Sequence, residues 1–179
     1  ILYTLVAFVG GFLLAVALVL MKLAPAAPLR WFATAYIELF RGLPALLVIL
    51  FMGFGIPIAT GWTPPGGTVG AGLTGLMLVA GAYMAETLRA GIQAVPPGQV
   101  EAARSLGMTP AQTMVHVTFP QALRIVVPPL TNELVILIKD TSLLFVLGFM
   151  TNQKELTTAA RDFMNAGPSA GTSTSLVFA

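Results

Sequence analysis

Two carboxylates and one ammonium group interrupt a long apolar run in the second half of the chain. Glu133, Lys139 and Asp140 lie within the hydrophobic segment from Ile125 to Met150. A charged side chain at the centre of a membrane helix costs about 2.5–3.5 kcal/mol on insertion scales, so it usually faces protein or a water-filled cavity. On a helix, Glu133 and Asp140 share one face because they are seven residues apart, and they repel each other unless a cation lies between them. This face suits the ammonium group or side chain of an amino acid, or basic groups of a neighbouring helix.

Lys139 has no carboxylate partner at helical spacing. It follows Pro129 by ten residues, so a helix that starts at Pro129 places it about 15 Å along the axis, near the middle of a membrane. Its neighbours three and four residues away are uncharged. Two interpretations remain open: an ion pair that holds helices or subunits together, or direct contact with a substrate. Asn132, Thr141 and Ser142 add hydrogen-bonding groups to the same region.

The composition identifies the solvent in which these residues lie. The 179 residues are 56% hydrophobic and 9% charged, whereas a soluble domain has about 25% charged residues. Lipid must therefore be the main solvent. The absence of cysteine excludes disulfides and thiolate sites, and the single histidine, His116, argues against a histidine metal site. A net charge of +2 is too small to indicate nucleic-acid binding.

Hydrophobic runs long enough to cross a membrane occur four times. A helix needs about 20 apolar residues to span the hydrocarbon core. The first run has no charge, the second and third are at the short end of the spanning range, and the fourth holds the charges described above. The sequence therefore predicts an all-α membrane protein with four spans: Ile1 to Met21, Gly42 to Ile58, Val69 to Ala85 and Ile125 to Met150.

Both ends of the chain resemble cut ends. The first residue is Ile1, already inside a hydrophobic run, and no basic leader precedes it as in a signal peptide. The last residues, Ser175 to Ala179, read like the first turn of another apolar helix. We therefore expect residues 1–179 to form one transmembrane domain that is truncated at both ends, with a fifth span beyond residue 179.

The basic residues predict which way the chain crosses the membrane. Segment 59–68, between the second and third runs, has no basic residue. Six of the nine basic residues lie in the two segments that the intervening spans place on one side: Lys22, Arg30, Arg41, Arg89, Arg104 and Arg124. The positive-inside rule makes that side cytoplasmic and puts the N-terminus outside.

One of these cytoplasmic segments contains signals for two short helices. Gln99 to Leu106 favours a helix, and Gly107 suits the left-handed position that ends one. Thr109 and Gln112 form a capping box that starts a second helix, which we expect to end near Pro120. Glu101 either pairs with Arg104 three residues later or remains available to another protein. Together the two helices predict a rigid projection from an otherwise apolar chain.

The residues of this projection resemble a known motif. Glu101-Ala102-Ala103, then Gly107, then Val117-Thr118-Phe119-Pro120 is similar to the cytoplasmic coupling motif of permease subunits of ATP-binding-cassette importers. The family prefers Ile and Leu where this chain has Val117 and Phe119, which keeps the apolar bulk. Five further segments resemble the polar amino-acid branch of that family: Tyr36 to Pro44, Ala82 to Ile92, Pro97 to Gln99, Pro120 to Arg124 and Lys139 to Leu143.

The resemblance implies a fold and a separate role for each subunit of the complex. The fold is the type I importer transmembrane fold, with residues 93–123 as a coupling segment. A separate cytoplasmic dimer of ATP-binding subunits docks on that segment and hydrolyses ATP. The coupling residues carried over from the motif are Glu101, Ala102, Ala103, Gly107 and Pro120.

The resemblance also implies the other partners and the location. These are a second permease subunit, either an identical copy or a paralogue, an extracytoplasmic amino-acid-binding protein, and the lipid of a bacterial cytoplasmic membrane. The chain has no G-x-x-x-x-G-K-[ST] phosphate loop, since none of its three lysines follows a glycine. We therefore expect a transport subunit with no cofactor and no catalytic residue of its own.

A second class of function remains as the alternative. A self-contained proton-coupled carrier or an intramembrane enzyme could use Glu133, Lys139 and Asp140 directly. Such a protein needs no cytoplasmic coupling segment, and the chain has no Ser-His or metal constellation that would support catalysis. The segment 93–123 therefore distinguishes the two classes.

Overall fold

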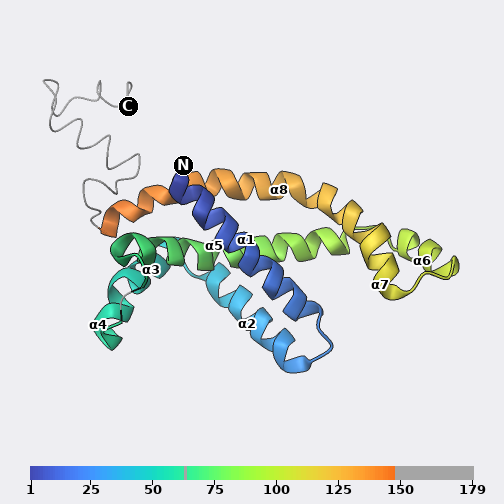
Figure 1. The fold of residues 1–179 in the computed structure, drawn as a ribbon, viewed down its shortest axis with the longest axis horizontal. Helices are drawn as coiled ribbons and strands as arrows, with labels where there is room; N and C mark the ends of the chain where they lie inside the picture. The colour runs from blue at the N-terminus through green and yellow to red at the C-terminus, as the bar shows by residue number, and fades with distance from the viewer. Residues whose placement is uncertain (63, 148–179) are drawn as a thin grey trace, which may run out of the picture.

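The computed structural model describes residues 1–62 and 64–147, and within those ranges it contains helices and no strand (Figure 1). Three helices are long and apolar enough to cross a membrane: α1 (Leu2–Leu23), α5 (Gly67–Gln93) and the run Pro110–Leu144. They correspond to the first, third and fourth predicted spans and confirm an all-α membrane protein. The end of the fourth predicted span and the helical turn expected at 175–179 lie outside the described residues.

The second predicted span is divided into several elements. Its first residue, Gly42, ends the preceding helix α2 (Ala27–Gly42), and the rest forms α3 (Ala45–Leu50), the π-helical turn η1 (Phe51–Gly55) and α4 (Ile56–Thr60). The helical direction changes by 105° between α2 and the α3–α4 run. The helix of this span begins at Ala45 rather than at the predicted Gly42, because Pro44 disfavours helical backbone at Leu43, whose ψ is 138°. Counted as one broken span, the two parts give a fourth candidate crossing.

Helix α2 was not predicted, since its basic residues favoured a loop. Its buried residues Ala33 and Ile37 are four apart and face the core. The hydroxyl of Tyr36 donates a hydrogen bond to the carbonyl of Leu78 in α5 at 2.9 Å. On another face, Trp31 is 77% exposed. This pattern is typical of an amphipathic helix that lies against the bundle and turns aromatic side chains toward the membrane interface.

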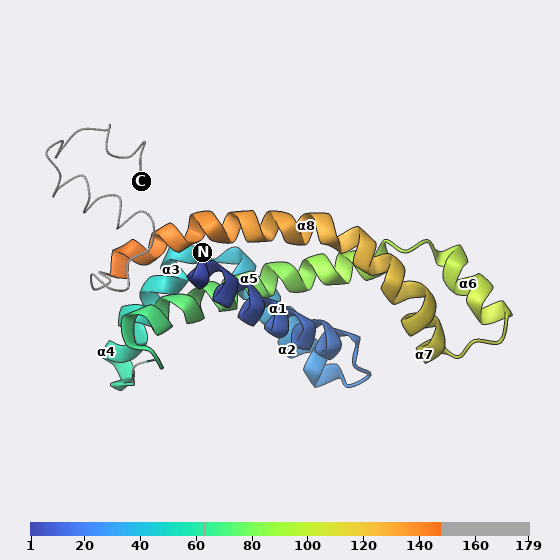
Figure 2. The same cartoon turned by 45° about the horizontal axis from the view of Figure 1, so that its top comes forward.

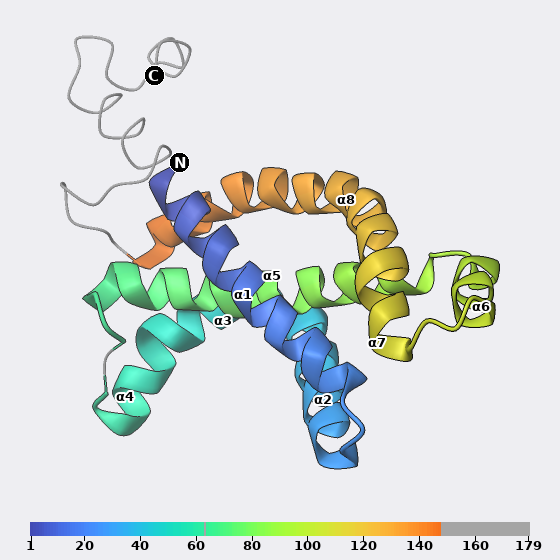
Figure 3. The ribbon, with the colours of Figure 1, turned by 45° about the vertical axis from the view of Figure 1, so that its right-hand side comes forward.

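Helix α5 is the centre of the bundle, and α1 and α8 (Phe119–Asp140) both pack against it (Figures 2 and 3). Small residues permit this close packing. A Cβ added to Gly11 of α1 would lie 3.0 Å from the Cβ of Ala80, and one added to Gly75 would lie 3.1 Å from the Cα of Ile49 in α3. Membrane helices associate closely at such small residues because lipid offers little hydrophobic drive for their association.

The contact between α5 and α8 depends on Gly91. A Cβ at this position would lie 2.0 Å from Cγ1 of Val126, a buried residue of α8. We expect Gly91→Ala to lower the free energy of unfolding by about 1–3 kcal/mol, since overpacking forces one helix to move. Denaturant unfolding of the full chain in micelles measures this loss. Gly42→Ala is the matched control, because its Cβ meets nothing within 4 Å. An equal loss in both variants would contradict the close α5–α8 contact.

The remaining elements lie at and beyond the ends of α5 and α8. They are α6 (Pro97–Ser105), α7 (Pro110–Thr113), the π-helical turn η2 (Met114–Thr118) and, after α8, the 3₁₀ helix η3 (Thr141–Leu147). Figure 1 shows α6 and α7 projecting from the end of the bundle that lies away from α3 and α4. This projection is the segment that the sequence predicted to consist of two short helices.

The sequence predicted that the second of those helices ends near Pro120. In the structure this helix instead continues through η2 into α8. The amide of Phe119 reaches back five residues to the carbonyl of Met114, and this wider turn accommodates the chain before the proline. Pro120 occupies the first turn of α8, where its fixed φ suits the helix. Pro128 and Pro129 lie inside α8, which continues past them.

Candidate functional site

The end of α6 is fixed by two backbone hydrogen bonds. The amide of Gly107 donates to the carbonyl of Arg104 at 3.0 Å, and the amide of Met108 donates to the carbonyl of Ala103 at 3.2 Å. This pair of bonds is the Schellman motif, which requires a left-handed residue directly after the helix. Gly107 has that conformation, with φ of 84°. The predicted left-handed glycine is therefore confirmed.

The start of α7 is fixed by a second pair of bonds. The amide of Gln112 donates to Oγ1 of Thr109 at 3.3 Å, and the amide of Thr109 donates to Oε1 of Gln112 at 2.8 Å. Pro110 stands in the first turn, where its fixed φ suits the helix. The predicted capping box is therefore confirmed, and only a few residues separate the two fixed helix ends.

The side chains of α6 divide into a buried and an exposed set. Ala103 is 5% exposed, whereas Glu101 and Ala102 are exposed. Within the described residues Glu101 forms no salt bridge, and the guanidinium of Arg104 donates to the carbonyl of Met108 instead. The possible Glu101–Arg104 pair is thus not formed. Sequence reasoning missed Leu106, which is 85% exposed at the end of the same helix.

A cavity of about 320 Å³ lies between α5, α8 and the start of α3. Glu133 and Asp140 both line it and are partly buried, so the prediction that they share a face is confirmed. The other lining residues are mostly apolar: Leu43, Pro44, Ala45, Leu76, Val79, Ala80, Tyr83, Ile136 and Leu137. The two carboxylates are therefore the charged groups of a mainly hydrophobic cavity.

Tyr83 lines this cavity and contacts Arg41, and neither residue was predicted as a site residue. The hydroxyl of Tyr83 donates to the carbonyl of Arg41 at 3.2 Å. The guanidinium carbon of Arg41 lies 5.6 Å from the centre of the Tyr83 ring, within the range of a cation–π contact. These residues are 42 positions apart in the chain, and no local sequence pattern joins them.

The other predicted polar residues of this region lie elsewhere. Asn132 and Lys139 are exposed and do not line the cavity. The hydroxyl of Thr141 donates to the carbonyl of Ile138 at 2.7 Å, and that of Ser142 donates to the carbonyl of Lys139 at 2.6 Å. Both hydroxyl hydrogens are thus used within the helix. Of the six predicted residues, the structure brings together Glu133 and Asp140.

The helical architecture and the projecting α6–α7 segment define a class of protein. This class has the type I permease fold of ABC importers, and a solved structure of an amino acid ABC transporter with histidines shares this fold. The two match with a TM-score of 0.83 and 38% identity, over 92% of this chain and 73% of that chain.

Residues 5–178 match the family of inner membrane components of binding-protein-dependent transport systems, and this chain belongs to that family. A probable glutamine ABC transporter permease protein of Bacillus subtilis, GlnM, is 44% identical over 142 residues, which cover 79% of this chain. The L-cystine transport system permease protein TcyB of the same organism is 36% identical, over 78% of this chain. The chain spans 64% and 58% of the length of these two relatives.

Proposed function

We propose that this chain is the transmembrane subunit of an ATP-driven importer that carries polar amino acids across the cytoplasmic membrane of a bacterium. The observation that carries the proposal is the rigid α6–α7 projection with its exposed Glu101, in a chain of the transport family described above. A self-contained carrier or intramembrane enzyme has no use for such a projection. The chain acts as a transport subunit, and ATP hydrolysis belongs to a partner.

The projection receives the motion of the ATP-binding subunits. Glu101, Ala102 and the exposed Leu106 present a surface to a groove on that dimer, and the bonds at Gly107 and Thr109 hold the surface in one shape. Small alanines allow close approach. A flexible loop would absorb the motion, whereas a rigid projection transmits it to the membrane spans. The spans then alternate between two states.

A continuous helix connects the projection to the cavity. The run Pro110–Leu144 includes both the capped start of α7 and the cavity residues Glu133 and Asp140. The thirty residue-to-residue steps from Pro110 to Asp140 correspond to about 45 Å of helix. A displacement at the cytoplasmic end therefore reaches the cavity through backbone hydrogen bonds, while α5 offers the opposing wall.

The cavity supports the choice of amino acids as the substrate class. The carboxylates of Glu133 and Asp140 can accept hydrogen bonds from an ammonium group, and charge-assisted bonds of this kind are stronger than neutral ones. The relatives named above transport glutamine and cystine according to their names. An extracytoplasmic binding protein delivers the solute, and a second permease copy or paralogue completes the pathway.

Reconstitution tests the proposal. The full-length chain is placed in liposomes with its ATP-binding subunit, any paralogous permease and a panel of amino-acid-binding proteins, and ATP hydrolysis and uptake are measured for each amino acid. We expect one or a few polar amino acids to stimulate both activities only in the presence of their binding protein. Uptake driven by a proton gradient without ATP would overturn the proposal and support the carrier.

A further inference from the structure

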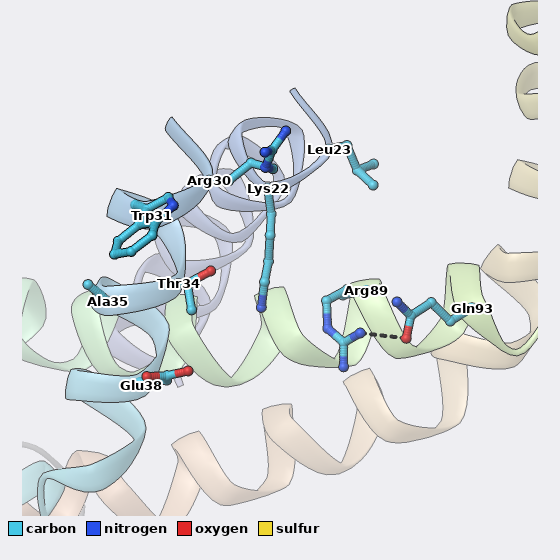
Figure 4. A pocket seen from close by; sticks show the side chains of 9 residues that line it. All are labelled: Lys22, Leu23, Arg30, Trp31, Thr34, Ala35, Glu38, Arg89 and Gln93. Carbon is cyan, nitrogen blue, oxygen red and sulfur yellow. Dashed lines mark hydrogen bonds between the residues drawn. The ribbon is translucent and has the colours of Figure 1, made fainter. Parts of the chain in front are cut away.

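A large polar cavity lies on the side of the bundle that carries most of the basic residues. It has a volume of about 680 Å³ and lies between the end of α1, the face of α2 and the last turns of α5 (Figure 4). Lys22, Arg30 and Arg89 line it, together with one carboxylate, Glu38. The coupling segment and the Glu133–Asp140 cavity use none of these residues, so the cavity belongs to neither site.

Two of the three cations are already paired. Glu86, next to the cavity in α5, accepts hydrogen bonds from Arg89, one of them from Nε at 3.0 Å. Its carboxylate also lies 3.6 Å from the ammonium nitrogen of Lys22. Arg89 donates further to Gln93. This network holds the end of α1 against α5. The ion pair with Glu86 does not use every ammonium hydrogen of Lys22, so donors remain.

Arg30 is the cation of this cavity that has no carboxylate partner within the described residues. One of its terminal nitrogens donates to the carbonyls of Ala24 and Pro25, at 3.3 Å and 2.9 Å. A guanidinium has five N–H donors in a fixed plane, so three remain for a ligand. The two carbonyls hold the guanidinium in place in the wall of the cavity, which Trp31 also lines (Figure 4).

An apolar groove adjoins this polar cavity. The groove has a volume of about 310 Å³ and lies between α1, α5 and the first turns of α8. Leu23 lines both spaces, so the polar cavity and the groove lie on either side of this side chain. The walls of the groove are apolar side chains, among them Phe12, Val16, Leu88, Ile92 and Leu123. A ligand that fills both spaces has an anionic end and a hydrocarbon end.

We propose that the two spaces together bind one anionic glycerophospholipid. Its phosphate binds the guanidinium of Arg30, its glycerol lies beside Trp31, and one acyl chain passes Leu23 into the groove. The unpartnered guanidinium selects an anionic headgroup over a zwitterionic one, because a choline or ethanolamine cation would repel it. Basic pockets between membrane helices on the cytoplasmic side are suited to such headgroups.

Trp31 reports on the polar cavity directly. The full chain carrying Trp62→Phe has Trp31 as its single tryptophan, and its fluorescence is followed in micelles during titration with phosphatidylglycerol, phosphatidylcholine or glycerol phosphate. We expect saturable binding of phosphatidylglycerol that is at least about fivefold tighter than that of phosphatidylcholine. Equal affinities for the two lipids would overturn the proposal. If glycerol phosphate binds as tightly as phosphatidylglycerol, the cavity is a site for free anions. This result would also overturn the proposal.

A matched pair of variants tests the assigned cation. Arg30→Gln should weaken phosphatidylglycerol binding about fivefold. Arg124→Gln removes a cation from α8 outside both spaces and should leave this binding unchanged. Arg30→Lys should restore part of the affinity. Helix content by circular dichroism checks folding, and Leu123→Asn in the groove gives a second variant, with weaker lipid binding expected. Unchanged binding in both Arg30→Gln and Leu123→Asn would contradict the proposal.

Discussion

Replacing Gly107 with valine is expected to reduce ATP-driven uptake at least about tenfold while most of the basal ATP hydrolysis by the assembled complex remains. Gly107 has φ of 84°, a conformation that costs an ordinary residue roughly 1–2 kcal/mol, and more if it is β-branched. Valine therefore breaks the bonds to Arg104 and Ala103 that end α6. Uptake and ATP hydrolysis measured in the same liposomes give the ratio of transported solute to hydrolysed ATP.

Two further variants distinguish the effect of backbone strain at Gly107 from the effect of side-chain size. Nothing lies within 4 Å of a Cβ added at Gly107 or at Gly98, so crowding inside the chain explains neither result. Gly98→Val should retain uptake, because its backbone does not require a left-handed residue. Gly107→Asn should retain most of it, because asparagine tolerates that conformation. If Gly107→Val transports as well as the unchanged protein, the coupling role of this turn is wrong.

The parts of the projection that could be predicted from the sequence depend on short-range bonds. The capping box joins Thr109 to Gln112, and the Schellman motif joins residues three and five apart around Gly107. Both require particular residue types at particular spacings, and no distant contact changes them. Pro120 misled the prediction, because a π-helical turn before it lets the helix continue. That turn leaves no residue-type signal in the sequence.

Only a part of the cavity lined by Glu133 and Asp140 could be predicted from the sequence, for a different physical reason. Helical periodicity places Glu133 and Asp140 on one face, but it cannot say which neighbouring helix that face meets. The cavity forms because α3 starts at Ala45 after the break at Pro44 and then packs against α5. Periodicity also separates Lys139 from that face by about 100°. Its exposed position in the structure agrees with that separation.

Removing the two cavity carboxylates should have the largest effect on the substrate itself. We expect Glu133→Gln with Asp140→Asn to lower uptake at a subsaturating amino-acid concentration by roughly tenfold to hundredfold. A hydrogen bond to a charged group contributes about 1.5–3 kcal/mol, and each 1.4 kcal/mol corresponds to a tenfold change. Uptake by the reconstituted complex, measured over a range of substrate concentrations with a fixed excess of binding protein, gives this loss.

The matched control is Lys139→Ala, one residue away from Asp140 but on an exposed face. This variant should leave the apparent substrate affinity unchanged, because Lys139 does not line the cavity. If it instead prevents the permease from assembling with its partner subunit, the ammonium group serves an ion pair between helices or subunits. A shift in amino-acid preference in Lys139→Ala, together with normal uptake in the carboxylate variant, would move the substrate pathway to the face of α8 that carries Lys139. The two carboxylates would then line a cavity that the solute does not use.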